Sequence, residues 1–188
     1  MKKKEELNII ISKCLRENRK AQEDLFKLFY GKMLGVSMRY TKDEDTAQEV
    51  VQESFIKCFD KLSTFDTDGY FEGWLKRIVI NTAIDNIRKS KKSPYVNDLN
   101  EDYSLSNEEE DDEDFEITKM KTDLIMNAIQ KLSPAYQAVF NLYVVEEYTH
   151  REIADMLKIS EGTSKSNLSK AKANLKKMLK TELLNLDI

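Results

Sequence analysis

Hydrophobic residues recur along most of this chain at intervals of three and four positions, the spacing of amphipathic α-helices. Before the middle of the sequence, this pattern predicts four successive helices. The third begins with acidic and capping residues at 43–46, and the fourth runs from about 70 to 90 after a loop at 65–69. The run at 78–80 alone suits a strand, but its length and flanks favour a helix. The expected inward positions are Leu7, Ile10, Ile11, Cys14 and Leu15; Leu25, Phe26, Phe29, Met33 and Val36; Val50, Val51, Phe55 and Phe59; and Trp74, Leu75, Ile78 and Ile84.

The same spacing returns in the last third of the chain, where the signals for helix starts are clearer. Ser133 and Pro134 place a cap and a first-turn proline before one helix. Thr149 is positioned to cap a short helix at 150–157, and a turn follows at 158–162 before the final helix. The expected inward positions are Val139, Leu142 and Tyr143, and then Leu168, Ala171, Leu175 and Met178.

The chain consists of two mildly basic segments on either side of a strongly acidic one, a pattern that the net charge of the whole chain hides. The sequence has 30 Lys and Arg against 34 Asp and Glu, a net charge of −4, which taken alone argues against a nucleic-acid binder. Residues 96–118, however, hold 11 acidic residues and no Lys or Arg, whereas 1–95 carry a net charge of +4 and 119–188 a net charge of +3. A self-repelling acidic block buries almost nothing, so we expect a flexible, disordered linker at 94–117.

These elements predict an all-α fold of two small helical domains, residues 1–93 and 118–188, joined by the acidic flexible linker. The 5 Gly and 2 Pro are too few for the many turns of a β-sandwich or barrel. No apolar run approaches the roughly 18 residues of a membrane span, so no membrane insertion is expected. Cys14 and Cys58 stand far apart without zinc-site spacing, and a reducing cytoplasm fits them best.

The sequence contains no recognisable catalytic constellation. His150 is the single histidine and is expected to lie exposed beside a helix cap. There is no glycine-rich phosphate loop, and none of the many acid pairs sits in a context that predicts burial. We therefore expect no enzymatic activity, no catalytic or metal-binding residues and no cofactor.

The helix at 150–157, the tight turn and the longer helix from 161 form a helix-turn-helix pattern. Ala154 is small where the two helices must cross closely, and an apolar seam lies between them. The second helix turns polar and basic side chains to solvent, where they are able to bond phosphates or base edges in a major groove. An ordinary helical hairpin with a solvated basic face is the alternative interpretation. The seam consists of Ile153, Leu157 and Ile159, and the solvent side of Lys165, Ser166, Asn167, Lys170 and Lys172.

A second basic cluster follows aromatic residues at 65–74, a combination that suits single-stranded nucleic acid because bases stack while phosphates pair with cations. Trp74, at helical spacing, is interpreted as a core residue, whereas Phe65 and Tyr70 stay open to both interpretations. Composition alone favours a solvated face for the acidic helix at 43–53. The basic members of the cluster are Lys76, Arg77, Arg88, Lys89, Lys91 and Lys92, and the aromatic members are Phe65, Tyr70, Phe71 and Trp74.

Three sequence blocks, in this order, resemble those of a known family. Residues 45–55, DTAQEVVQESF, resemble the region 2.2 signature of the extracytoplasmic-function (ECF) sigma factors of bacterial RNA polymerase, within the sigma-70 family. Residues 71–85, FEGWLKRIVINTAID, resemble regions 2.3 and 2.4 of that family. Residues 132–134, 148–157 and 160–163 resemble its region 4. The resemblance covers nearly the whole chain and implies a factor for promoter-specific transcription initiation.

The resemblance also implies partners and contact residues. Core polymerase would bind the region 2.2 helix through its β′ clamp coiled coil and region 4 through its β flap, and an anti-sigma factor is a common further partner. The implied polymerase-binding residues are Gln48, Glu49, Gln52 and Glu53. The implied contacts to the −10 element, one base of which would flip into the loop at 64–69, are Thr64, Phe65, Asp66, Asp68, Lys76, Arg77, Asn81, Asp85 and Arg88. The implied contacts to the −35 element are Thr163, Lys165, Ser166, Asn167 and Lys170.

Two other classes of protein are alternatives. A stand-alone helix-turn-helix regulator would use residues 1–95 as a sensor or dimerisation domain and would bind duplex operators without polymerase. An enzyme is the third class, against which the single histidine and the missing phosphate loop argue. The promoter sequence, the inducing signal and the existence of an anti-sigma factor do not follow from these residues.

Overall fold

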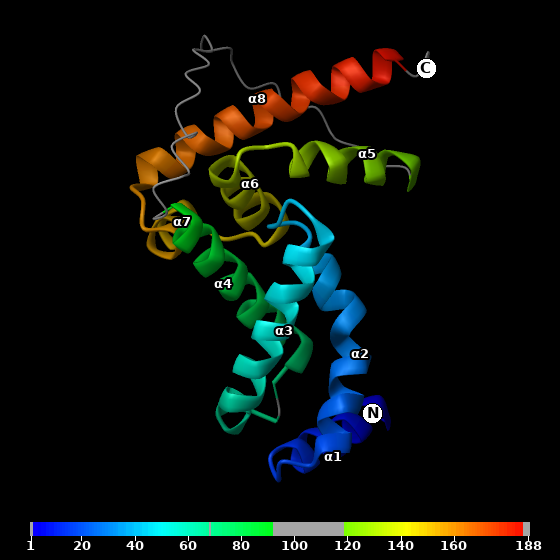
Figure 1. Cartoon of the computed structure of the whole chain (residues 1–188). Helices are drawn as coiled ribbons and strands as arrows, with labels where there is room; N and C mark the ends of the chain where they lie inside the picture. The colour runs from blue at the N-terminus through cyan, green and yellow to red at the C-terminus, as the bar shows by residue number, and fades with distance from the viewer. Residues whose placement is uncertain (1, 68, 92–118, 186–188) are drawn as a thin grey trace. The chain divides into compact units, whose positions relative to one another are not determined.

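The computed structural model describes residues 2–67, 69–91 and 119–185, and every regular element among them is helical (Figure 1). The chain divides into two compact units, Met1–Asn86 (unit 1) and Ile87–Ile188 (unit 2). Asp68 and the acidic linker predicted at 94–117 lie outside the described residues. The prediction of an all-α fold is confirmed for the described part of the chain.

Unit 1 contains α1 (Lys2–Cys14), α2 (Arg19–Ser37), α3 (Glu44–Lys61), the short 3₁₀ turn η1 (Leu62–Thr64) and α4 (Phe71–Lys91), the last of which continues past the division between the units. The second helix packs against both α1 and α3. It also meets the start of α4, because Phe29 and Phe71 place their ring centroids 5.2 Å apart and Lys32 pairs with Glu72 at 2.6 Å. The large side chains that exclude solvent completely include Leu25, Val50, Val51, Leu75 and Val79.

Two helix starts in unit 1 are fixed by side-chain caps. Asn18 precedes α2, and its Oδ1 accepts a hydrogen bond of 2.9 Å from the backbone N–H of Ala21. Asp43 precedes α3, as its sequence predicts, and its Oδ1 accepts a hydrogen bond of 2.7 Å from the backbone N–H of Thr46. Hydrogen bonding from Thr46 holds the pKa of Asp43 below its usual value. Each cap satisfies a backbone donor that the first turn of a helix leaves without a partner.

Unit 2 contains α5 (Lys119–Gln130), α6 (Pro134–Phe140), the π-helical segment η2 (Asn141–Val145), α7 (His150–Leu157) and the long α8 (Glu161–Asn185). The final helix packs against α5, α6 and α7 (Figure 1). Pro134 occupies the first turn of α6 as predicted, although the Ser133 side chain makes no capping hydrogen bond. The core cluster between α5 and α8 is formed by Ala128, Ile129, Leu132, Ala171 and Leu175.

Two of the expected inward positions, Leu15 and Tyr143, are wrong because these side chains are exposed. Leu15 directly follows Cys14, the last residue of α1, and is exposed where the chain turns. Tyr143 is exposed because η2 widens the helix, with the Glu146 N–H bonding the carbonyl of Asn141 five residues earlier. Ile78 is only half-buried. The buried apolar residues of α4 are Phe71, Leu75, Val79, Ile80, Ala83 and Ile84, and Thr82 is buried as well.

The other expected inward positions divide into two groups. Leu7, Ile10, Phe26, Phe59, Trp74 and Met178 are half-buried. The buried group is Ile11, Cys14, Leu25, Phe29, Met33, Val36, Val50, Val51, Phe55, Leu75, Ile84, Val139, Leu142, Leu168, Ala171 and Leu175.

Candidate nucleic-acid and polymerase interfaces

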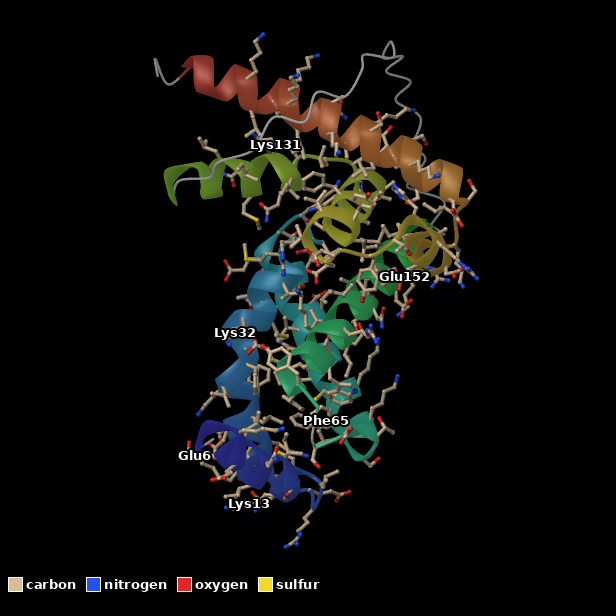
Figure 2. All side chains as sticks on the ribbon, turned by 180° about the vertical axis from the view of Figure 1, so that it is seen from behind. Glu6, Lys13, Lys32, Phe65, Lys131 and Glu152 are labelled. Carbon is tan, nitrogen blue, oxygen red and sulfur yellow. The ribbon has the colours of Figure 1, made fainter. Side chains whose placement is uncertain are left out.

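The helix-turn-helix of unit 2 starts with a reciprocal cap on α7. Thr149 Oγ1 accepts a hydrogen bond of 3.3 Å from the Glu152 N–H, while Glu152 Oε2 accepts one of 2.9 Å from the Thr149 N–H (Figure 2). This capping box secures a helix of only 8 residues, too short to be stable by itself. Lys158 then adopts a left-handed conformation, with φ at 56°, and turns the chain toward α8. The prediction that Thr149 caps this helix is confirmed.

Small and apolar side chains hold α7 against α8. Ile153 and Ala154 are buried on α7, as expected where two helices cross closely, and Leu168 is buried on α8. Leu157 and Ile159, the other members of the predicted seam, are half-buried. The start of α8 is ordered by Ser160, whose Oγ accepts a hydrogen bond of 2.9 Å from the Thr163 N–H.

The opposite face of α8 presents the residues predicted to contact the −35 element. Thr163, Lys165, Ser166 and Lys170 are exposed, and Asn167 is half-buried. The Ser166 hydroxyl donates to the Thr163 carbonyl at 3.0 Å. The face therefore combines hydroxyl groups with lysine ammonium groups, which suit phosphate oxygens and base edges.

His150 is not the exposed residue that the sequence suggested. Its side chain is half-buried, and its Nδ1 lies 2.9 Å from the Oγ of Ser164 on α8. Its ring also stacks on Tyr143, with centroids 4.5 Å apart and planes inclined by 21°. Ser164 itself is completely buried. Sequence reasoning missed this contact because its partners lie 7 and 14 positions away from His150.

An aromatic cluster packs between η1 and α4 of unit 1. Phe65, in the segment that joins these elements (Figure 2), lies 5.2 Å from both Phe71 and Trp74, measured between ring centroids. Phe65 and Trp74 are half-buried, so the core interpretation of Trp74 holds in part. Thr64 and Asp66 are exposed beside this cluster, whereas Asp68 lies outside the described residues.

Tyr70, by contrast, is 71% exposed at the entrance to α4. Its ring lies across Gly73, where an added Cβ would come within 2.8 Å of Tyr70 Cδ1. A glycine at this position therefore gives the exposed aromatic ring room to lie on the first turn of the helix. The sequence left the role of Tyr70 open, and the missing side chain at Gly73 is the signal that would have indicated this arrangement.

The remaining residues predicted to contact the −10 element are all carried by α4. Asn81 and Arg77 are exposed, and Lys76, Asp85 and Arg88 are half-buried. Arg88 lies beyond Asn86, where unit 1 ends. Because α4 is one continuous helix, this series spans about three turns of regular backbone.

The predicted polymerase-binding residues lie on the solvent side of α3. Glu49 and Gln52 are exposed, and Gln48 and Glu53 are half-buried. Ile56, which follows Gln52 by one helical turn, is 63% exposed and was not identified from the sequence. A large exposed aliphatic side chain beside these polar residues offers apolar area that a docked partner would remove from water. We call Gln48, Glu49, Gln52, Glu53 and Ile56 the α3 surface.

One member of the α3 surface is tied to α4. Lys57 Nζ lies 2.9 Å from Glu53 Oε1 and donates a hydrogen bond of 3.2 Å to Thr82 Oγ1. Thr82 is buried and directly follows Asn81 in the sequence. A single lysine therefore joins a predicted polymerase contact to the helix that carries the predicted −10 contacts.

The two cysteines are free thiols buried in unit 1. Burial raises the pKa of Cys58 to about 12, and the pKa of Cys14 is also raised by burial. Within the described residues, no group of three or more His, Cys, Asp or Glu side chains is placed to hold a metal ion. The helices of that same part of the chain include none long and apolar enough to cross a membrane.

Comparison with known proteins identifies two regions of one family in this chain. Residues 25–93 match the family described as Sigma-70 region 2, and residues 122–175 match Sigma-70, region 4. The chain is 26% identical over 185 residues to the ECF RNA polymerase sigma factor SigW of Bacillus subtilis, covering 93% of this chain and 99% of that protein. It is 27% identical over 177 residues to the RNA polymerase sigma-H factor of Pseudomonas aeruginosa, covering 90% and 92%.

The fold has a counterpart among solved structures. The sigma factor RpoE of Bartonella quintana, in complex with the anti-sigma factor NepR, is similar with a TM-score of 0.50 at 20% sequence identity. That similarity covers 84% of this chain and 96% of the other chain. The protein belongs to the sigma-70 family and, within it, to the ECF sigma factors.

Proposed function

We propose that this chain directs a bacterial core RNA polymerase to promoters by binding the polymerase, reading the −35 and −10 elements and assisting DNA melting. The observation that carries the proposal is the order of its two matched regions, region 2 followed by region 4, with an exposed basic face on the second helix of a helix-turn-helix. The domains proposed for these tasks are residues 1–93 and 118–188, joined by the acidic linker at 94–117.

The α3 surface is the proposed contact with the β′ clamp coiled coil. Ile56 lies one helical turn beyond Gln52 and Glu53, so docking would bury an aliphatic side chain beside these polar groups. Region 4 would meet the β flap as a second contact.

The segment at 64–69 and helix α4 are the proposed reader of the −10 element. An unpaired base of the non-template strand would enter the loop, with Thr64, Phe65, Asp66 and Asp68 around it. The exposed ring of Tyr70 offers a further surface on which a base can stack, an interaction worth about 1–3 kcal/mol. The contacts proposed along α4 are Lys76, Arg77, Asn81, Asp85 and Arg88.

The exposed face of α8 is the proposed reader of the −35 element. Lys165 and Lys170 extend into solvent on the side away from the buried Ala171. In a major groove, these side chains would reach guanine acceptors or phosphates, while Thr163, Ser166 and Asn167 supply neutral polar groups.

The −10 and −35 contacts, each weak alone, are expected to bind DNA tightly together when polymerase holds both domains at one promoter. Segments 1–95 and 119–188 carry net charges of only +4 and +3, which suggests modest affinity of each for free duplex. Binding to core polymerase makes the second DNA contact intramolecular and raises its effective concentration. The chain alone is therefore expected to bind promoter duplex poorly.

The proposal describes a non-catalytic factor that acts in the cytoplasm, where transcription occurs. An anti-sigma factor is a proposed partner, since the similar Bartonella quintana protein was solved with one. Such a partner would compete for surfaces that polymerase or DNA uses.

A selection experiment with purified core polymerase tests the proposal. A pool of duplexes with randomised −35 and −10 boxes is incubated with core polymerase, with and without the chain, and complexes that survive a heparin challenge are sequenced. We expect enrichment of two boxes at a fixed spacing only when both proteins are present. Equal enrichment by the chain without polymerase would favour a stand-alone regulator instead.

A further inference from the structure

We propose that His150 and Ser164 form a positioning pair that sets the rotation of helix α8, and with it the ability of Lys165 to read the −35 element. The inference rests on the proposed function, because it assigns a task to residues that support the −35 contacts. Neither residue belongs to the exposed face of α8: Ser164 is buried and His150 opens α7.

The pair joins the two helices of the helix-turn-helix where α8 begins. His150 Nδ1 and Ser164 Oγ share a hydrogen bond of 2.9 Å across 14 residues of sequence. Apolar side chains are also buried on these two packed helices, among them Ile153, Ala154 and Leu168. Apolar contacts are not directional, whereas a hydrogen bond weakens steeply as its angle departs from linearity. The His150–Ser164 bond is therefore a directional contact that, beside the packing of α8 on α5 and α6, constrains rotation about the α8 axis where the helix begins.

His150 is itself held on two sides. Its ring stacks on Tyr143 at a centroid distance of 4.5 Å, and its backbone follows the capping box between Thr149 and Glu152. The orientation of the imidazole is thus set by contacts outside α8. Its hydrogen bond to Ser164 therefore positions α8 relative to α7.

A small rotation of α8 about its axis displaces the Lys165 side chain by a distance that helix geometry fixes. Ser164 and Lys165 are neighbours, so their side chains leave the axis about 100° apart. At a side-chain radius of about 5–6 Å, a rotation of 10° moves a side-chain atom by about 1 Å. A displacement of that size takes a base contact out of the 2.7–3.2 Å range of a good hydrogen bond. Loss of the pair would therefore reduce sequence discrimination more than overall attraction to DNA.

The test uses holoenzyme on the promoter recovered from the randomised pool and on a copy with a scrambled −35 box. The variants are Ser164→Ala, His150→Phe and the double variant, each checked for folding by its thermal unfolding midpoint. We expect either single change to lower the ratio of initiation on the two templates about 2- to 10-fold, the range of one lost hydrogen bond. The double variant should be no worse than the more severe single variant, because both remove the same bond.

Ser12→Ala is the matched control, a serine-to-alanine change at an exposed site on α1 outside every proposed contact, and it should keep the wild-type ratio. A lowered unfolding midpoint with an unchanged ratio would overturn the positioning role, as would losses that multiply in the double variant. His150 is the single histidine, so its ring nitrogens are observable by NMR without overlap. An Nδ1 signal insensitive to Ser164→Ala would also overturn the inference. Wild-type holoenzyme that ignores the −35 box would contradict the proposed function instead.

Discussion

Replacement of Ile56 by alanine tests the proposed polymerase contact with the least disturbance of the fold. Ile56 is 63% exposed on α3, so its removal leaves the core of unit 1 intact and should not change the unfolding midpoint. Ile56→Ala deletes three carbon atoms, each worth about 0.8 kcal/mol when buried. Scaled to the 63% of the side chain that docking could newly cover, the expected loss is about 1.5 kcal/mol, or about tenfold in Kd.

The assay is a titration of fluorescently labelled chain with core polymerase in the absence of DNA. Ile9→Ala is the matched control, since Ile9 is 56% exposed on α1 and lies outside the α3 surface. We expect a weaker Kd for Ile56→Ala and an unchanged Kd for Ile9→Ala. Unchanged affinity of Ile56→Ala, or an equal loss in both variants, would refute the reasoning that places Ile56 in the interface.

Four further predictions concern single residues. Lys165→Ala should weaken use of the −35 element about tenfold while leaving the Kd for core polymerase unchanged; an equal loss of core binding would contradict its role in DNA reading. Tyr70→Ala should slow promoter opening about tenfold, as followed by permanganate reactivity of unpaired thymines, whereas Tyr70→Phe keeps the stacking ring; equal behaviour of the two variants would argue against stacking. Thr149→Ala should lower the free energy of unfolding by about 1 kcal/mol in urea titrations, with Thr149→Ser close to wild type; no loss would mean that the capping box contributes nothing. Because burial raises the pKa of Cys58 from 9.0 to about 12, the unfolded thiol ionises first, so stability should fall as pH rises from 9.0 toward 12; a Cys58→Ala variant with the same loss in this window would assign the fall to other groups.

Local signals in the sequence predicted the helix starts well. A capping side chain and the backbone that it satisfies lie within three residues of each other, as with Asp43 and Thr46 or Thr149 and Glu152. The pattern therefore contains both partners of the interaction. The apolar face of α2 was also readable, because its helix is regular and its buried positions repeat with the helical period.

Features that depend on tertiary geometry could not be read in the same way. The π-helical widening of η2 rotates Tyr143 away from the position that an α-helix would give it. The stacking of His150 on that ring and its bond to Ser164 require the chain to fold back on itself. The acidic block makes the net charge of the whole chain negative and so hides the net positive charge of the two flanking segments. Counting charge segment by segment reveals it.

Transcription in vitro by purified core polymerase, with the 5′ ends of the products sequenced, tests the central claim most directly. The template is the promoter pool with randomised −35 and −10 boxes, and the reaction is run with and without the chain. The account predicts chain-dependent transcripts that start at a fixed distance downstream of two selected boxes. It also predicts fewer such transcripts with Ile56→Ala at limiting chain concentration and a weaker −35 preference with Lys165→Ala. Identical transcripts in the presence and absence of the chain would contradict the account.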